Sequence, residues 1–345
     1  MTATLTPAST ITRTSTWRDD LLCSLTGMWL IGGLYLDGWA HVHRPDLETF
    51  FTPWHAVLYS GFAALAAALL APTLRRRRVS PAPRDWAPPG YGLGLLGAAL
   101  FAAGGLADTA WHQVLGIEVN LEALLSPPHL ALLTGGILMI TTAVRATVAR
   151  EGGLPAGPLR ALPAIAALAV VAATAAFFLS YVSPFTDLPA VSLPHDWQAL
   201  GLAQYLVGTA VLVVPVLTGY ALGRRIPPGL ITAVVAAVAL PAGVFTDFRW
   251  PGAQLGAVAG AVVADTVVQA VAARAPQLTA PAAGAAIPLL VWAGHLAGVA
   301  ATVGIGWSVE MWAGVVVLTA LAGTVLGGLS RPSARPAPPP GQRRL

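Results

Sequence analysis

The chain has little of what a soluble enzyme usually contains. Only 10% of its 345 residues are charged, lysine is missing, and the one cysteine is Cys23. A single cysteine excludes a disulfide within the chain and any CxxC metal or redox motif. The formal net charge of +4 comes from arginines in short segments between apolar runs, a pattern that indicates membrane topology and not nucleic-acid binding.

Apolar sequence is abundant: 56% of the residues are hydrophobic, and the mean hydropathy is +0.70. Apolar runs of roughly 20 residues recur, each long enough to cross about 30 Å of hydrocarbon. We therefore expect an all-α, polytopic transmembrane helix bundle of about ten spans. The expected spans are 20–40, 54–72, 90–111, 128–148, 160–182, 197–221, 229–247, 252–272, 282–303 and 311–329.

The arginines predict the orientation of the bundle. All but Arg44 and Arg249 lie in the terminal segments or in the loops after even-numbered spans. Because positively charged loops stay cytoplasmic, both chain ends are expected inside, and most histidines and acids fall at the opposite, outer turns. We expect a cytoplasmic segment at 1–19, a transmembrane domain at 20–329 and a disordered cytoplasmic tail at 330–345, in the cytoplasmic membrane of a bacterium.

Two outer turns repeat each other. The first reads DGWAHVHRPDLETFFTPWHAVLYSG from Asp37, and the second reads DTAWHQVLGIEVNLEALLSPPHLALLTG from Asp108. The matched positions predict duplicated helical hairpins at about 20–72 and 90–148, with a third, degenerate copy at 160–221. The matched residues are Asp37 with Asp108, His41 with His112, Glu48 with Glu122, Thr52 with Ser126, and His55 with His129.

The spacing brings carboxylates and imidazoles together. Each aspartate precedes a histidine by four residues, so both lie on one face of a helix. Thr52-Pro53 and Ser126-Pro127 suit the cap and first position of the next helix, which places His55 and His129 on its first turn. There the positive end of the helix dipole keeps an imidazole neutral and able to bind a metal.

Each hairpin is thus predicted to offer one carboxylate and two imidazoles to a metal at the outer face. Such nitrogen and oxygen ligands suit copper, with zinc or non-haem iron as alternatives. Glu48, Glu118 and Glu122 are candidate proton acceptors or bridging ligands. His295, within the ninth span, is either a further ligand or a partnered core histidine. A proton relay, substrate hydrogen bonding and plain interfacial solvation are the competing interpretations of these residues.

The motif Asp37-x3-His41-x13-His55 resembles the copper-ligand pattern in the membrane C subunit of the particulate methane and ammonia monooxygenases. Asp108-x3-His112-x16-His129 is similar, with a longer gap. The resemblance implies an intramembrane copper site near the outer face and oxidation of a small apolar substrate. The sequence as a whole resembles bacterial multi-pass membrane proteins that have no assigned activity.

Three functions follow from these patterns. The first is a copper-dependent membrane oxidoreductase, similar to a monooxygenase, that takes a small apolar substrate from the lipid. The second is binding or transport of copper or zinc, for which Asp265 is one of few polar groups deeper in the bundle. The third is a zinc-dependent membrane hydrolase with a glutamate base. The expected partners are the bilayer, the substrate, and further copies or other subunits, but no nucleic acid.

Overall fold

The computed structural model describes residues 14–44, 52–116, 120–192 and 197–330, and all regular structure in these ranges is helical. The fold class is therefore all-α, as predicted. The long helices are α1 (Trp17–His43), α2 (Pro53–Arg77), α3 (Gly92–Leu115), α5 (Pro127–Ile140), α6 (Thr142–Glu151), α7 (Pro158–Phe178), α9 (Gln198–Gly223), α10 (Leu230–Ala242), α11 (Pro251–Arg274), α12 (Thr279–Thr302) and α13 (Val309–Leu329). The short ones are α4 (Asn120–Leu125), α8 (Pro189–Ser192) and the 3₁₀ turns η1 (Pro83–Asp85), η2 (Ser180–Val182), η4 (Gly243–Thr246) and η5 (Pro276–Leu278).

Within the described residues, nine helical segments are long and apolar enough to cross a membrane, with α5 and α6 together forming one of them. The tenth expected span, 229–247, is the shorter apolar segment Leu230–Thr246. It consists of α10 and η4, because the α-helix passes Pro241 and gives way to a 3₁₀ turn at Gly243. At the usual rises per residue the two pieces cover about 28 Å, close to the thickness of the hydrocarbon layer.

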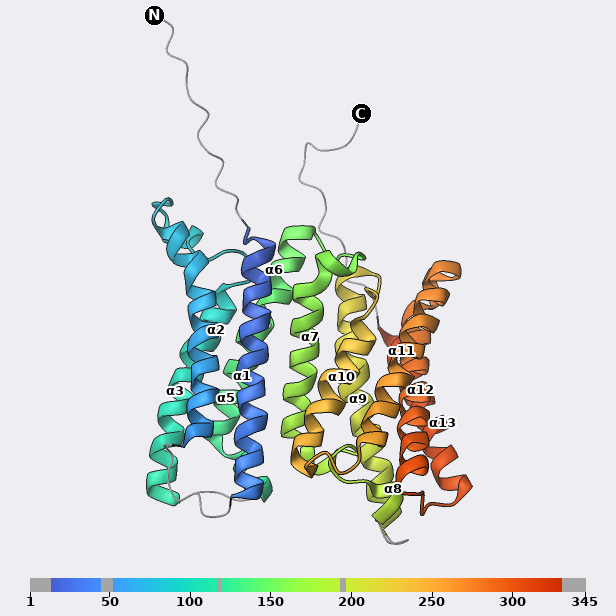
Figure 1. Cartoon of the computed structure of the whole chain (residues 1–345). Helices are drawn as coiled ribbons and strands as arrows, with labels where there is room; N and C mark the ends of the chain where they lie inside the picture. Colours follow the sequence, from blue (N-terminus) through green and yellow to red (C-terminus); the bar gives the residue numbers. More distant parts are fainter. Residues whose placement is uncertain (1–13, 45–51, 117–119, 193–196, 331–345) are drawn as a thin grey trace, which may run out of the picture.

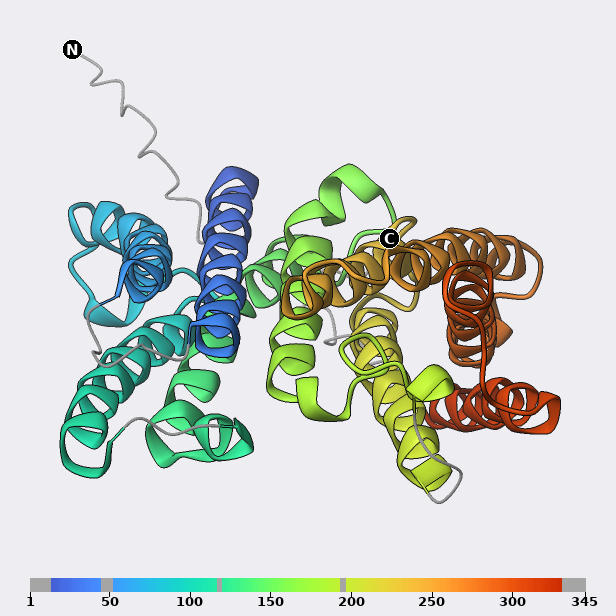
Figure 2. The ribbon, with the colours of Figure 1, turned by 60° about the horizontal axis from the view of Figure 1, so that its bottom comes forward.

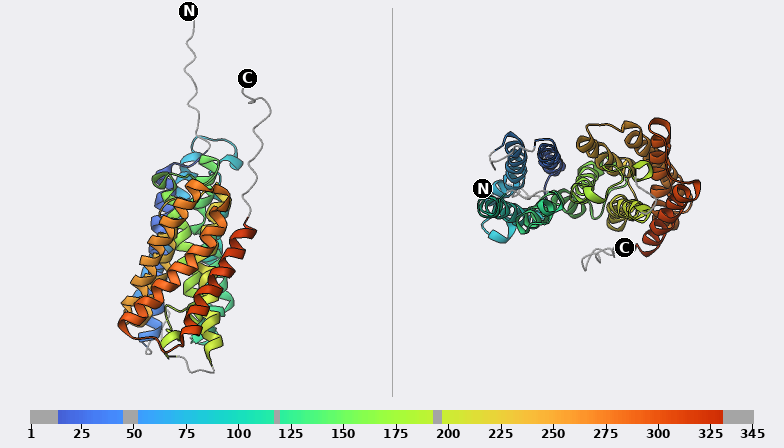
Figure 3. Two further views of the ribbon diagram at one scale, coloured as in Figure 1. Left: turned by 90° about the vertical axis from the view of Figure 1, so that its right-hand side faces the viewer. Right: turned by 90° about the horizontal axis from the view of Figure 1, so that it is seen from below.

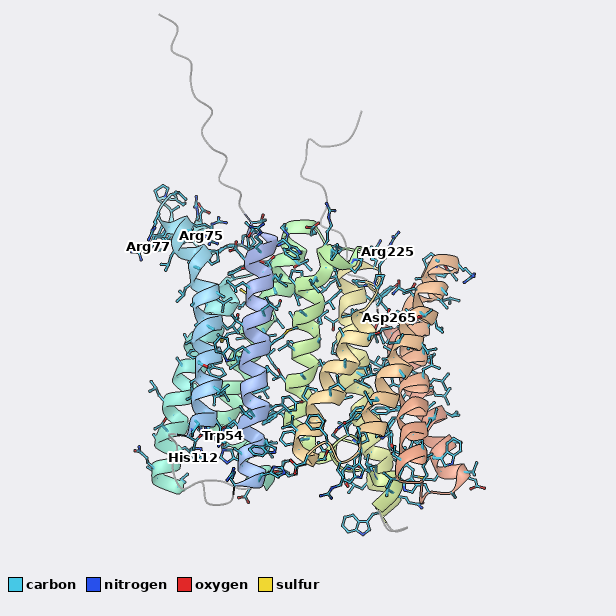
Figure 4. The ribbon with its side chains drawn as sticks, in the orientation of Figure 1. Trp54, Arg75, Arg77, His112, Arg225 and Asp265 are labelled. Carbon is cyan, nitrogen blue, oxygen red and sulfur yellow. The ribbon has the colours of Figure 1, made fainter. Side chains whose placement is uncertain are left out.

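The two ends of the bundle differ in charge. The start of α1 and the end of α13 lie at the same end of the molecule, as an even number of crossings requires (Figures 1 and 3). Arg75, Arg77 and Arg225 lie at that end, whereas Trp54 and His112 lie at the opposite end (Figure 4). The start of α1, the end of α13 and these arginines therefore share one end of the bundle, and the cytoplasmic location of that end stays a prediction.

The helices form two groups on either side of α7. Figure 2 shows α1, α2, α3 and α5 on one side and α9 to α13 on the other. Helix α7 packs against α1 and α10, and 78% of its apolar stretch is buried, the largest share of the nine segments. At the histidine-bearing end, Asp247 accepts a hydrogen bond from the Trp39 indole (3.2 Å) and pairs with His43 (3.1 Å). These contacts join the two groups near the predicted site.

A buried ionic network secures the arginine-rich end of α1. The Asp20 carboxylate is fully buried and accepts hydrogen bonds from the Ser15 hydroxyl (2.7 Å) and the Tyr91 hydroxyl (3.0 Å). Arg150 forms an ion pair with it. Because a buried carboxylate is stable only when it is paired, this network ties α1 to the start of α3 and the end of α6.

Candidate metal centre

The first Asp/His/His group lies where α1 ends and α2 begins. Asp37 and His41 stand one helical turn apart on α1, and His55 faces them from the first turn of α2. The Asp37 carboxylate lies 3.6 Å from His41 Nε2 and 3.5 Å from His55 Nδ1. One ligand atom from each of the three residues lies within 4.8 Å of the other two.

The second group repeats this arrangement at the end of α3 and the start of α5. Asp108 Oδ1 lies 3.4 Å from His112 Nε2 and 3.7 Å from His129 Nε2, and the three ligand atoms again lie within 4.8 Å of one another. His112 Nδ1 lies 3.2 Å from the Gly116 carbonyl oxygen. A backbone hydrogen bond at Nδ1 fixes an imidazole so that Nε2 faces a metal.

The separations suit a shared ion. Two ligands bound 2.0–2.2 Å from one metal at tetrahedral angles are about 3.3–3.6 Å apart. The aspartate–histidine separations of the two groups, from 3.4 to 3.7 Å, lie in or next to this range. The sequence prediction that a carboxylate and two imidazoles converge in each hairpin therefore agrees with the geometry.

The caps of α2 and α5 hold the second histidine of each group. Thr52 is the N-cap of α2, and its hydroxyl accepts a hydrogen bond from the backbone N–H of His55 and lies 3.1 Å from His55 Nδ1. Ser126 is the N-cap of α5, and its hydroxyl lies 2.7 Å from His129 Nδ1. In the second group, His129 contacts Ser126 through Nδ1 and faces Asp108 with Nε2, which is the arrangement expected for a metal-ligating imidazole.

A glycine one turn before each aspartate allows the two helices of each hairpin to approach. A Cβ added to Gly33 would lie 2.7 Å from the Leu58 Cα on α2. The same contact recurs in the second hairpin, where a Cβ on Gly104 would lie 3.2 Å from Leu132 on α5. The repeat therefore extends upstream as Gly-x3-Asp-x3-His, a signal visible in the sequence but absent from the prediction.

A second close contact of a glycine also recurs, about one helical turn farther from the aspartate in each hairpin. A Cβ on Gly61 would lie 2.6 Å from the Leu30 Cα, and one on Gly135 would lie 2.7 Å from the Phe101 backbone nitrogen. Gly61 and Gly135 are matched positions of the repeat, as are Leu30 and Phe101. The two hairpins are thus duplicated in their packing as well as in their sequence.

The two aspartates are buried, and no arginine of the described residues forms an ion pair with them. Asp37 is 8% exposed and Asp108 is 1% exposed, and Asp108 Oδ1 accepts no hydrogen bond from the described residues. In the described part of the chain, the arginine ion pairs go to Asp19, Asp20 and Glu151. Because a buried carboxylate is costly unless a proton or a cation compensates its charge, a bound metal ion would stabilise both groups.

Both groups border one cavity of about 60 Å³. Asp37 and His55 line it from the first hairpin, and Asp108 and His129 line it from the second. The other walls are mostly apolar and include Leu34, Leu58, Phe101, Leu132 and Phe178. A small molecule in this cavity would meet ligands of both groups within an apolar environment.

Of the three candidate glutamates, the structure describes only Glu122. Glu122, in the short helix α4, is exposed and belongs to neither group. Glu48 and Glu118 lie outside the described residues, as does His195 of the degenerate third copy. The structure therefore places Glu122 outside both groups of possible ligands.

His295 lies away from both groups, in the half of the bundle that contains α9 to α13. It is fully buried on α12, with Phe185, Tyr205 and Trp292 around its ring at centroid distances of 5.2–5.8 Å. It approaches the Ala253 carbonyl, but neither ring nitrogen reaches hydrogen-bond geometry with any described residue. The groups of three possible ligands found among the described residues do not include His295.

The Asp265 carboxylate is held by hydrogen bonds to neighbouring groups of the bundle. Its carboxylate accepts hydrogen bonds from the backbone N–H and the hydroxyl of Thr232, both at 3.3 Å, and from the Gln269 amide at 3.4 Å. Thr232 lies in the first turn of α10, where backbone N–H groups have no partner in their own helix. Asp265 therefore caps α10 from the neighbouring helix.

Comparison of the chain with protein-family models, with curated proteins and with solved structures finds no match. The case for a metal centre therefore comes from the geometry of this chain: two matched Asp/His/His groups, within a membrane-spanning helical bundle, at the ends of duplicated hairpins.

Proposed function

We propose that the protein is an integral membrane metalloenzyme that binds one metal ion at each Asp/His/His group and oxidises a small apolar molecule in the cavity between them. The observation that carries this proposal is the shared cavity, which ligands from both groups line among apolar side chains. The helices that border the cavity are among those long and apolar enough to cross a membrane.

Copper is the metal that we assign to these sites. The ligands are imidazole nitrogens and carboxylate oxygens, and among first-row divalent ions such a set binds copper most tightly. The two motifs also resemble the copper ligands of the monooxygenase C subunit. Zinc and iron are the alternatives, because both accept the same ligands.

The reaction class that fits best is monooxygenation. In such a reaction dioxygen is the oxidant, one of its oxygen atoms enters the substrate, and the other leaves as water with two protons and two electrons from a reductant. The chain would provide the binding sites for the metals and an apolar wall that favours a hydrocarbon over a polar molecule.

The two competing functions have less support from the described residues. Transport requires polar groups along the bundle, but Asp265, one of few candidates, caps α10. A zinc hydrolase requires a general base beside the metal, but Glu122 is exposed and joins neither group. The apolar cavity therefore favours oxidation of an apolar substrate.

Metal analysis of the purified protein tests the proposal. We expect two copper ions per chain after anaerobic loading, and loss of one ion in each of His55→Ala and His129→Ala. His295→Ala is the matched control, since this histidine lies outside both groups and should keep both ions. Unchanged copper content in both the His55 and His129 variants would end the proposal, and binding of zinc alone, with no redox-active metal, would favour the hydrolase.

A further inference from the structure

The two hairpins differ at several matched positions beside the cavity, and two of these positions bring a tyrosine and a glycine together. Tyr59 follows His55 by four residues, and Leu133 occupies the matching position after His129. Gly105 precedes Asp108 by three residues, and Leu34 occupies the matching position before Asp37. The pair Tyr59 and Gly105 therefore corresponds, in the repeat, to the pair Leu133 and Leu34. Tyr59, Leu133 and Leu34 all line the cavity.

Tyr59 extends from the first hairpin to the second. Its ring stacks on the His55 imidazole, with centroids 6.3 Å apart and planes at 20°, and packs edge-on against Phe101 of α3. Its hydroxyl lies against Gly105, where an added Cβ would be 2.9 Å from the oxygen. Any larger residue at Gly105 would occupy the space of the phenol, so the glycine allows Tyr59 to reach α3 one turn before Asp108.

The Tyr59 hydroxyl adds a polar group to an apolar wall. Two residues that line the cavity bear a hydroxyl, Tyr59 and Thr174. The phenol also lies within electrostatic range of both Asp108 and Asp37. Tyr59 thus contacts a ligand of the first group with its ring and places its hydroxyl beside the second.

We propose that Tyr59 is a positioning residue that couples the two metal sites: its ring fixes the plane of His55, and its hydroxyl donates a hydrogen bond to a small oxygen or nitrogen ligand bound to metal in the cavity. This inference rests on the proposed metal binding. It makes the two sites unequal, because the second hairpin has only Leu133 at the corresponding position.

Azide binding to the copper-loaded protein tests this role, because azide is a small anion that binds Cu(II) and accepts hydrogen bonds. Tyr59→Phe removes the hydroxyl and keeps the ring, so it should keep two copper ions per chain and weaken azide binding by about ten-fold. Tyr59→Leu also removes the ring and should in addition change the EPR spectrum of the copper held by His55. Tyr205→Phe is the matched control, because this phenol is buried in the other half of the bundle and should leave both readouts unchanged.

Gly105→Ala adds a test that does not remove the hydroxyl. The new methyl group should displace the phenol and weaken azide binding as Tyr59→Phe does, and the double variant should bind azide no more weakly than Tyr59→Phe alone. Full azide affinity in Tyr59→Phe, with two copper ions bound, would refute the role of Tyr59 and leave the proposed function intact. Failure of the wild-type protein to bind copper would overturn both proposals.

Discussion

Gly33 provides a strict test of how the first metal site is built. In Gly33→Ala the new methyl carbon would lie 2.7 Å from the Leu58 Cα and 2.9 Å from its nitrogen, both of them backbone atoms. Carbon atoms in ordinary contact are 3.5–4.0 Å apart, so α1 and α2 must separate by about 1 Å. Metal–ligand distances tolerate only about 0.2 Å, and a shift of this size would remove His55 from the coordination sphere.

The expected result is loss of the first metal ion and retention of the second. Elemental analysis and a copper titration should show one ion per chain in Gly33→Ala, or an affinity at the first site reduced by about 100-fold or more. Gly32→Ala is the matched control, because its added Cβ has no described atom within 4 Å. Two ions bound with unchanged affinity in Gly33→Ala would refute the argument that this helix crossing sets the position of His55.

Two further predictions concern the rest of the bundle. Arg150→Ala should lower the free energy of unfolding by about 3–5 kcal/mol, because it leaves the buried Asp20 carboxylate without its cation. Thermal unfolding of the protein in detergent measures this loss. The double variant that also carries Asp20→Asn should recover much of the lost stability, because the buried charge is then removed. Labelling with a membrane-impermeant maleimide tests the predicted topology in a Cys23→Ser variant, which has no other thiol. Leu115 is 63% exposed, and Leu115→Cys should react in intact spheroplasts. Arg84→Cys should react only after the spheroplasts are lysed. Labelling of Arg84→Cys from outside would reverse the assigned orientation.

The sequence predicts the helices well because the membrane imposes a simple rule on them. Backbone groups in hydrocarbon must be satisfied within each segment, so an apolar run of about 20 residues reads directly as a helix. The span at 229–247 is one exception, because Pro241 and Gly243 shorten the α-helix and add a 3₁₀ turn, and the span at 128–148 is another, because it divides into α5 and α6. The caps at Thr52 and Ser126 were likewise predictable, because Ser/Thr-Pro is a local signal.

The candidate ligands were also predictable, but their surroundings were not. The repeat identifies Asp37, His41 and His55 and their counterparts, since matched spacing survives in the sequence. The role of Tyr59 was not predicted, because its significance lies in reaching Gly105 on a helix from the other hairpin. The sequence did not indicate that His295 lies in the other half of the bundle, outside both groups of possible ligands.

The sequence by itself determined the fold class, the duplicated hairpins and the residue types offered at each turn, because all three depend on local composition and spacing. Only the tertiary structure decided that the two groups border one cavity and that Glu122, the one candidate glutamate within the described residues, stays outside both. The reason is physical: which helices become neighbours depends on close glycine contacts and buried pairs between segments far apart in the chain, and no local pattern specifies them.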